Sequence, residues 1–253
     1  MITLKSSEQI QLMYLSGQVL AQTHAKMREL VRPGITTAQL DRAAEDYIRA
    51  RGAIPSFKGF QGFPGSICVA INDEVVHGIP DDITLQDGDI IGLDIGTILG
   101  GWHADSAQTL PVGEITSEAR KLLTITEEAL WAGIGQAKPG NRLGDISSSV
   151  EAVGKRAGYG VVRELVGHGI GRQMHEDPQV PNFGKAGRGL LLKAGMTLAI
   201  EPMFNLGTSR VMLGPDNWTV KTADGKLSAH FEHTVAICED GPKVLTILQE
   251  AKS

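Results

Sequence analysis

The sequence predicts an α+β fold in which helices cover the outer face of a mainly antiparallel, curved sheet. Three observations favour this class: four segments with helical periodicity, strand-like segments between and after them, and an internal repeat that brings one acid into an apolar strand of each half. The chain has 253 residues, and no Pro- or Ser-rich linker divides it. We therefore expect residues 1–253 to form a single domain of two pseudo-symmetric halves.

Four helices are expected from apolar residues at helical spacing and from start and stop signals. Ser6 and Gln9 are spaced for a capping box at the first helix, and Pro33-Gly34 stops that helix. The expected helices cover residues 8–30, from 36 or 37 to 52, from 116 or 117 to shortly before 139, and 143–157.

Strands are expected where apolar and β-branched residues cluster between turn signals. These segments are residues 67–71, 89–95, 103–112, 196–202, 217–222 and 227–238.

The repeat appears at a spacing of 106 or 107 positions. Pro33-Gly34 recurs at 139–140, Gly52 recurs at 158, and the segment 85–88 is matched by 192–195. In each copy an acid follows the last glycine by six residues within an apolar strand: Asp94 in the first and Glu201 in the second. Two copies of a helix–helix–strand unit fit this pattern, and the period is too long for a solenoid.

Four carboxylates lie in apolar strands, where charged groups are rare unless they are paired or bound to metal. They are Asp94, Asp105, Glu201 and Glu232. A turn at Leu99-Gly100 would place Asp94 directly opposite Asp105, whereas a turn at Gly100-Gly101 would make them diagonal neighbours on one face. Carboxylates this close either share a proton or neutralise a cation.

His168 lies among glycines in residues 167–171, which leaves room for close approach. Four carboxylates and one neutral imidazole carry a charge of about −4, which two divalent cations would cancel. Oxygen ligands with one imidazole favour Mn, Fe or Co, although zinc also occupies carboxylate–His sites.

Net charge, cysteine content and the lack of long apolar segments limit the binding partners and the cellular compartment that we expect. The formal charge of −5 disfavours nucleic acid or an anionic membrane as the main partner. Only Cys68 and Cys238 occur, which argues against a disulfide framework and for a reducing compartment. The N-terminal segment lacks the layout of a signal peptide, and no apolar run is long enough to span a bilayer. A cytoplasmic protein is expected.

These residues and their flanks resemble the type I methionine aminopeptidases of peptidase family M24, which have the pita-bread fold. The resemblance covers nearly the whole chain. Its motifs are residues 66–80, 93–96, 105–107, 167–171, 175–178, 200–203 and 231–234. The 26 residues from His175 to Glu201 leave no room for the long insert of type II enzymes, so a bacterial-like, stand-alone type I enzyme is expected.

The resemblance implies a set of metal ligands. Asp94 chelates one of two divalent ions (Co, Mn, Fe or Zn), Asp105 and Glu232 bridge both, and His168 and Glu201 complete the other. It also implies that a metal-activated bridging hydroxide attacks the first peptide carbonyl, which releases the N-terminal methionine when the second residue is small.

Further roles follow from the same resemblance. Glu201 is the expected general base, His175 contacts the carbonyl oxygen, and His77 contacts the scissile amide nitrogen or assists the leaving group. His230 alternates onto the face of Glu232, while His24 is expected on a helix surface. The expected methionine pocket consists of Phe57, Phe60, Phe63, Cys68, Met174 and Trp218, since a thioether packs favourably on aromatic rings.

The expected partners are peptides or nascent chains that begin with methionine. Docking on a ribosome would suit such an enzyme, and a monomer is expected. The rival interpretations are another pita-bread hydrolase such as a prolidase or aminopeptidase P, an inactive binding protein on the same fold, and a single-metal binding or storage protein.

Overall fold

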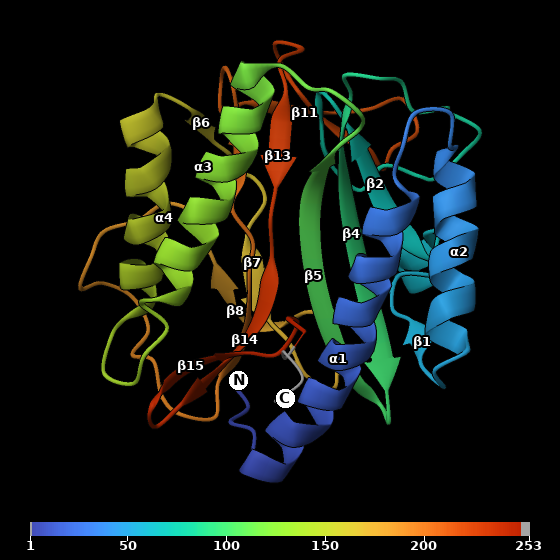
Figure 1. Cartoon of the computed structure of the whole chain (residues 1–253). Coiled ribbons are helices and arrows are strands. Elements are labelled where there is room, and N and C mark those ends of the chain that lie inside the picture. Colours follow the sequence, from blue (N-terminus) through green and yellow to red (C-terminus); the bar gives the residue numbers. More distant parts are fainter. Residues whose placement is uncertain (1, 249–253) are drawn as a thin grey trace, which may run out of the picture.

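Helices form the outside of the molecule and the strands lie between them (Figure 1). The computed structural model describes residues 2–248. Helices α1 and α2 flank one side of the strands, and α3 and α4 flank the other, which confirms the predicted α+β class. The helical elements are α1 (Ser7–Leu30), α2 (Thr37–Arg49), the 3₁₀ turn η1 (Phe60–Gly62), α3 (Ser117–Ile134) and α4 (Leu143–Ala157).

Capping residues fix the helix starts as predicted. The Gln9 backbone N–H donates to Ser6 Oγ, and the Ser6 backbone N–H donates back to the Gln9 side chain. Thr36 and Gln39 form the same reciprocal pair at α2. At its C-terminal end α4 is closed by Gly158 in the left-handed conformation, with φ of 76°. Both α2 and α3 end a few residues before the predicted limits.

Strands of the first half form one four-stranded sheet: β2 and β1 pair with successive parts of β4, and β5 pairs with β4 along its whole length. In the second half the order is β15-β14-β9-β7-β8, and β13-β10-β6 form a three-stranded sheet of the same half. A further three-stranded sheet, β11-β12-β3, pairs a strand of the first half with strands of the second. The strands of the first half are β1 (Ile54–Pro55), β2 (Ile67–Ile71), β3 (Glu74–Val76), β4 (Ile90–Leu99) and β5 (Trp102–Pro111). The later strands are β6 (Gly160–Val161), β7 (Gly167–Gly169), β8 (Glu176–Val180), β9 (Thr197–Ile200), β10 (Met203–Asn205), β11 (Val211–Leu213), β12 (Val220–Thr222), β13 (Ser228–His230), β14 (His233–Cys238) and β15 (Gly241–Val244).

The hairpin between β4 and β5 turns at Gly100-Gly101, because Leu99 pairs with Trp102. Both glycines have positive φ, 59° and 77°, which a two-residue hairpin turn of this kind requires at both central positions. Asp105 therefore lies opposite Gly96 and is a diagonal neighbour of Asp94. Of the two registers that the sequence left open, the structure has the one with the turn at Gly100-Gly101.

Two of the predicted strands contain a break. The segment 196–202 contains β9, which pairs with β14, and its last two residues, Glu201-Pro202, are a break. The chain re-enters a sheet only beyond the predicted limit, as β10, which pairs with β13. The segment 227–238 breaks at Phe231-Glu232 between β13 and β14. Proline has no N–H to continue a ladder, which accounts for the first break. Both breaks place an acid where the chain passes from one sheet to another.

Each half has its own apolar core, in keeping with the repeat. Helices α1 and α2 pack on the first sheet, and α3 and α4 pack on the second. Fully buried side chains of the first core include Leu20, Met27, Leu40, Ile48, Ile91 and Leu93, and those of the second include Leu122, Leu198 and Val235. Burial of each such side chain contributes roughly 1.5–3 kcal/mol relative to exposure.

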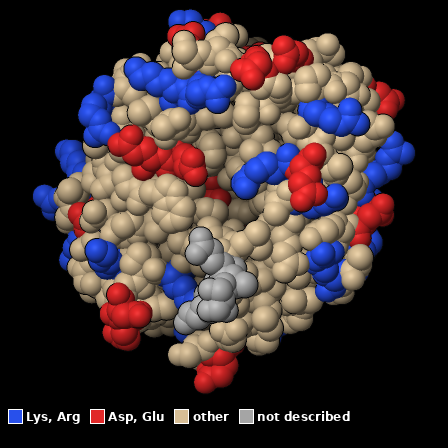
Figure 2. All heavy atoms as spheres, viewed as in Figure 1, with Lys and Arg blue, Asp and Glu red and all other residues tan. Residues whose placement is uncertain are grey.

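The face shown in Figure 2 carries basic and acidic residues interspersed rather than a patch of one sign. It is hollowed between α3 and α1, where a cavity of about 260 Å³ lies on the outer side of β5 and β14. His24 lines this cavity but is buried, with Nε2 2.9 Å from the Ser106 carbonyl oxygen, so its predicted surface position was wrong. In the described part of the chain, no helix has the length and apolar character needed to cross a membrane.

We predict that Gly17→Ala destabilises the fold, because a Cβ there would overlap the Leu245 carbonyl oxygen and push α1 off the chain that follows β15. Such overpacking costs about 1–3 kcal/mol, equivalent to a melting temperature lower by roughly 2–10 °C for a chain of this size. Gly135→Ala is the matched control, since its Cβ would lie 3.4 Å from the nearest carbonyl oxygen, an ordinary contact. Equal melting temperatures for both variants in thermal unfolding would contradict the packing account.

Candidate active site

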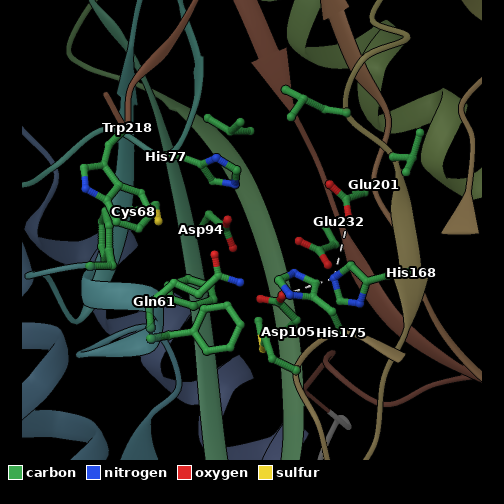
Figure 3. Close-up of a pocket in the computed structure, with 17 residues that line it drawn as sticks. Gln61, Cys68, His77, Asp94, Asp105, His168, His175, Glu201, Trp218 and Glu232 are labelled. Atoms are coloured by element: carbon green, nitrogen blue, oxygen red, sulfur yellow. Dashed lines mark ion pairs between the residues drawn. The ribbon is translucent and has the colours of Figure 1, made fainter. Parts of the chain in front are cut away.

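A cavity of about 200 Å³ lies between the two halves (Figure 3). Every predicted site residue lines it, from all four acids to the aromatic set. Four more residues that the sequence analysis did not single out also line it: Gln61, Val76, Leu165 and Val166. These four carry no charge or metal-binding pattern, so only their position in the folded chain reveals them.

The four carboxylates reach the cavity from different elements. Asp94 comes from β4 and Asp105 from β5, both in the first half. Glu201 and Glu232 come from the second half, at the two strand breaks described above. Figure 3 shows these carboxyl groups turned toward a common centre.

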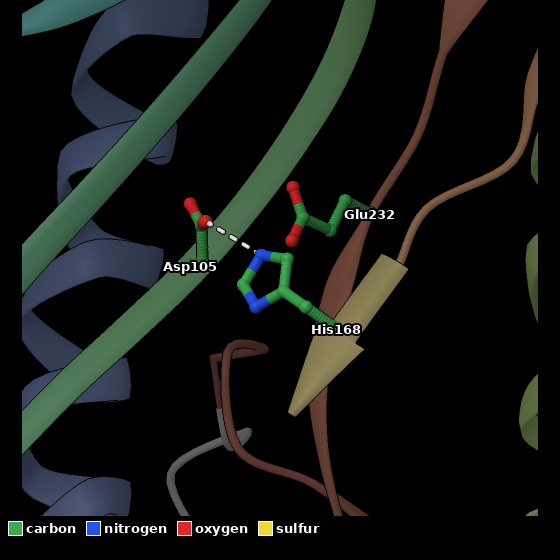
Figure 4. A group of neighbouring side chains, drawn as sticks. All are labelled: Asp105, His168 and Glu232. Atoms are coloured by element: carbon green, nitrogen blue, oxygen red, sulfur yellow. Dashed lines mark ion pairs between the residues drawn. The ribbon is translucent and has the colours of Figure 1, made fainter. Parts of the chain in front are cut away.

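His168, on β7, faces the acids (Figure 4). Its Nε2 lies 3.9 Å from Asp105 Oδ2 and 3.7 Å from Glu201 Oε1. One ligand atom from each of Asp105, His168 and Glu232 lies within 4.8 Å of the other two. Nδ1 is 2.8 Å from the Gly169 carbonyl oxygen, which can only accept, so Nδ1 carries the hydrogen and Nε2 presents its lone pair to the site.

Burial dominates the electrostatics of the site. It raises the pKa of Asp94 to about 7, and it raises the pKa values of Asp105, Glu201 and Glu232 well above their ordinary range. Burial also lowers the pKa of His168 to about 4, so its imidazole is neutral at pH 7.

The donor set fits divalent cations. Asp94 Oδ1, Asp105 Oδ1 and Glu232 Oε1 are buried and have no hydrogen-bond partner within residues 2–248, and no Lys or Arg of that range lines the cavity. Buried carboxylates without partners are expensive unless a cation neutralises them. Hard carboxylate oxygens with one neutral imidazole are suitable ligands for Mn, Fe, Co or Zn.

Two further histidines line the cavity. His77 follows β3 with a positive φ of 63°, an uncommon conformation outside glycine that is often found at functional sites. His175 packs edge-on against His168, with ring centroids 4.4 Å apart. The residue after it, Glu176, is fixed by a largely buried ion pair with Lys5 of the N-terminal segment, at 2.6 Å between Nζ and Oε2.

The other wall of the cavity is apolar. Phe63 and Trp218 meet edge to face, with centroids 5.1 Å apart, and Phe60 lies 5.4 Å from the His175 ring. Cys68 is opposite Asp94 in the β2–β4 ladder. Burial and the nearby carboxylates raise the pKa of the Cys68 thiol, which makes it a wall residue rather than a nucleophile.

Comparison with known proteins agrees with this architecture. The model of metallopeptidase family M24 matches residues 11–239. The chain belongs to this family. A methionine aminopeptidase of Clostridium perfringens is 53% identical over 249 residues, covering 98% of this chain and 100% of that protein.

Solved structures of M24 enzymes share the fold. The crystal structure of methionine aminopeptidase from Rickettsia prowazekii superposes with a TM-score of 0.96 at 38% identity, covering 98% of this chain and 100% of that one. Prolidase from Pyrococcus furiosus matches at a TM-score of 0.79 and 23% identity, which shows likeness of fold alone, and this chain covers 66% of its length.

We predict that Mn²⁺ raises the melting temperature more at pH 8 than at pH 5.5. Between the ordinary pKa of Asp94 and its raised value of about 7, the folded metal-free protein retains a proton that the unfolded chain has lost. The free energy of unfolding of the metal-free protein therefore falls as pH rises through this window, and the full loss is reached above it. A cation that binds the ionised acids restores the lost stability.

The measurement is thermal unfolding with Mn²⁺ or with EDTA at both pH values, and Asp94→Asn is the control in which the pH dependence of the metal effect should shrink. An equal metal effect at both pH values in the unmodified protein would count against a cation-neutralised acid cluster.

Proposed function

We propose that this M24 protein is a metal-dependent methionine aminopeptidase that removes the N-terminal methionine from nascent proteins and peptides whose second residue is small. The observation that carries the proposal is the meeting of five metal-binding side chains with an aromatic-walled cavity at one site. The full-length similarity to proteins named methionine aminopeptidase supports the same conclusion.

Asp94, Asp105, His168, Glu201 and Glu232 would hold the metal. Two divalent ions fit best, because four carboxylates with one neutral imidazole carry a charge of about −4 when ionised. Such ions supply Lewis acidity for the peptide carbonyl and for the attacking water. Co, Mn, Fe and Zn all suit the donor set.

The protein's own residues would position the substrate and move the proton. Glu201 lies on the cavity wall beside His168, where its carboxylate can accept the proton of the attacking water. His175, held by its packing on His168, would donate a hydrogen bond to the developing oxyanion. His77, on the side of Asp94 in Figure 3, would contact the scissile amide nitrogen.

The aromatic wall would bind the methionine side chain. A flexible thioether gains from sulfur–aromatic contacts with Phe60, Phe63 and Trp218, and Met174 and Phe57 close the same cavity. Because the cavity is short and walled, it suits a single unbranched residue and leaves the remaining peptide outside.

The proposal also covers the cellular location, the oligomeric state and the domain organisation of the protein. We propose a cytoplasmic monomer with one catalytic domain over residues 1–253, built from two halves with separate cores and acting on chains that leave the ribosome. A prolidase-like activity and a binding or storage role are the alternatives. The intact donor set beside a specific cavity favours catalysis over binding or storage.

We predict release of methionine from Met-Ala-Ser when Mn, Fe, Co or Zn is added, with Met-Lys-Ser and Leu-Ala-Ser cleaved at least 10-fold more slowly. Misfit of a side chain in an apolar pocket changes rates by about 10–200-fold. The assay measures free amino acid by chromatography and includes Ala-Pro as a prolidase substrate. Leucine release as fast as methionine release would contradict the specificity, and preferred cleavage of Ala-Pro would support the prolidase alternative.

We predict that His77→Ala lowers kcat by about 100-fold or more while metal content is unchanged, because general acid–base assistance contributes 10²–10⁴-fold and no ligand is removed. His103→Ala is the matched control, since His103 contacts Ser56 at 3.1 Å and does not line the cavity. Near-normal turnover of the His77 variant would remove His77 from the mechanism.

A further inference from the structure

His230 lies directly behind the acid cluster without lining the cavity. Its side chain is 4% exposed at the end of β13. Nε2 lies 3.8 Å from Glu201 Oε2 and 3.9 Å from Glu232 Oε2. Within residues 2–248 this nitrogen has no hydrogen-bond partner. A buried polar atom in that position requires an explanation.

The backbone of His230 is held by a local two-fold arrangement. Its N–H donates to Thr109 Oγ1 at 2.9 Å, and that hydroxyl donates back to the His230 carbonyl oxygen at 2.9 Å. Thr234 makes the same pair of bonds to Asp105, at 2.9 and 2.8 Å.

Between these two pairs, the backbones of Ala107 and Glu232 exchange two hydrogen bonds, at 2.8 and 3.3 Å. The arrangement makes His230 the counterpart of Asp105 and Ala107 the counterpart of Glu232. The two-fold arrangement of hydrogen bonds therefore places the side chain of His230 against the acid cluster from the second half, as it places Asp105 from the first half.

The two buried imidazoles near Glu201 face it in opposite tautomers. Nδ1–H of His168 donates a hydrogen bond to a backbone carbonyl oxygen, so Nε2 is unprotonated and presents its lone pair to Glu201. Nε2 of His230 faces two carboxylates, and a lone pair there would be repelled by both. When a cation keeps both carboxylates ionised, Nε2 of His230 therefore carries the hydrogen, and rotation of either carboxylate would bring it within hydrogen-bond length.

We propose that His230 is a positioning residue of the metal centre: its Nε2–H holds Oε2 of Glu201 and Glu232 and thereby presents their other oxygens to the cations. Glu201 Oε1 already faces His168 Nε2, and Glu232 Oε1 has no hydrogen-bond partner in the described chain. Donors to ligating carboxylates orient them and strengthen metal binding. The proposal rests on the metal site of the proposed function and deepens it.

The test compares His230→Leu and His230→Gln by calorimetric titration with Mn²⁺ and by the visible absorption spectrum of the Co²⁺-loaded protein. The leucine variant should bind Mn²⁺ about 10–100-fold more weakly and change the Co²⁺ spectrum. The glutamine variant should stay within about threefold of the unmodified protein, because its amide N–H replaces the donor. His103→Leu is the control and should bind normally.

Unchanged Mn²⁺ affinity in His230→Leu would overturn the proposal, as would a glutamine variant as weak as the leucine variant. If the leucine variant does not fold, ¹⁵N-histidine spectra of the unmodified protein with Zn²⁺ decide the question. Nε2 of His230 should keep its hydrogen when Zn²⁺ binds, and loss of that hydrogen would show a direct ligand instead. Normal metal binding without methionine release would refute the proposed function and leave this inference intact.

Discussion

The structure depends on the burial of four carboxylates at the junction of its two halves. Asp105 and Glu232 are buried, Asp94 and Glu201 are largely shielded from water, and within residues 2–248 no Lys or Arg lines their cavity. Such a cluster is stable only when protonated or when cations neutralise it. Because the acids come from both halves, whatever neutralises them adds to the apolar clusters that already join the halves.

Hydrogen bonds with a local two-fold arrangement hold the backbone at this junction, and the side chains at related positions differ. The threonine pairs of Thr109 and Thr234 hold equivalent segments of the two halves in equivalent positions. The side chains at those positions are not equivalent: Asp105 corresponds to His230, and Glu232 corresponds to Ala107. The backbone arrangement is thus symmetric while the side chains are not: the position held by Asp105 in the first half is held by the imidazole of His230 in the second.

The cavity wall that carries His175 also depends on a distant segment. Lys5, near the N-terminus, pairs with Glu176, and the Gln173 N–H donates to the other oxygen of that carboxylate at 3.2 Å. This closes the turn that carries His175. The N-terminal segment, which does not line the cavity, therefore orients a residue that does.

The sequence by itself predicted the helices, the repeat, the family and the candidate site residues, because caps, apolar periodicity and acids within apolar strands are local signals. It left open the β4–β5 turn, which was decided by the positive φ values of Gly100 and Gly101 in the folded hairpin. Only the tertiary structure showed that Glu201 and Glu232 lie at breaks between sheets, that His24 is buried, and that His230 approaches the acids from behind. The burial of His24 against Ser106 and the approach of His230 to Glu201 arise from contacts between residues more than 20 positions apart, which no local pattern encodes.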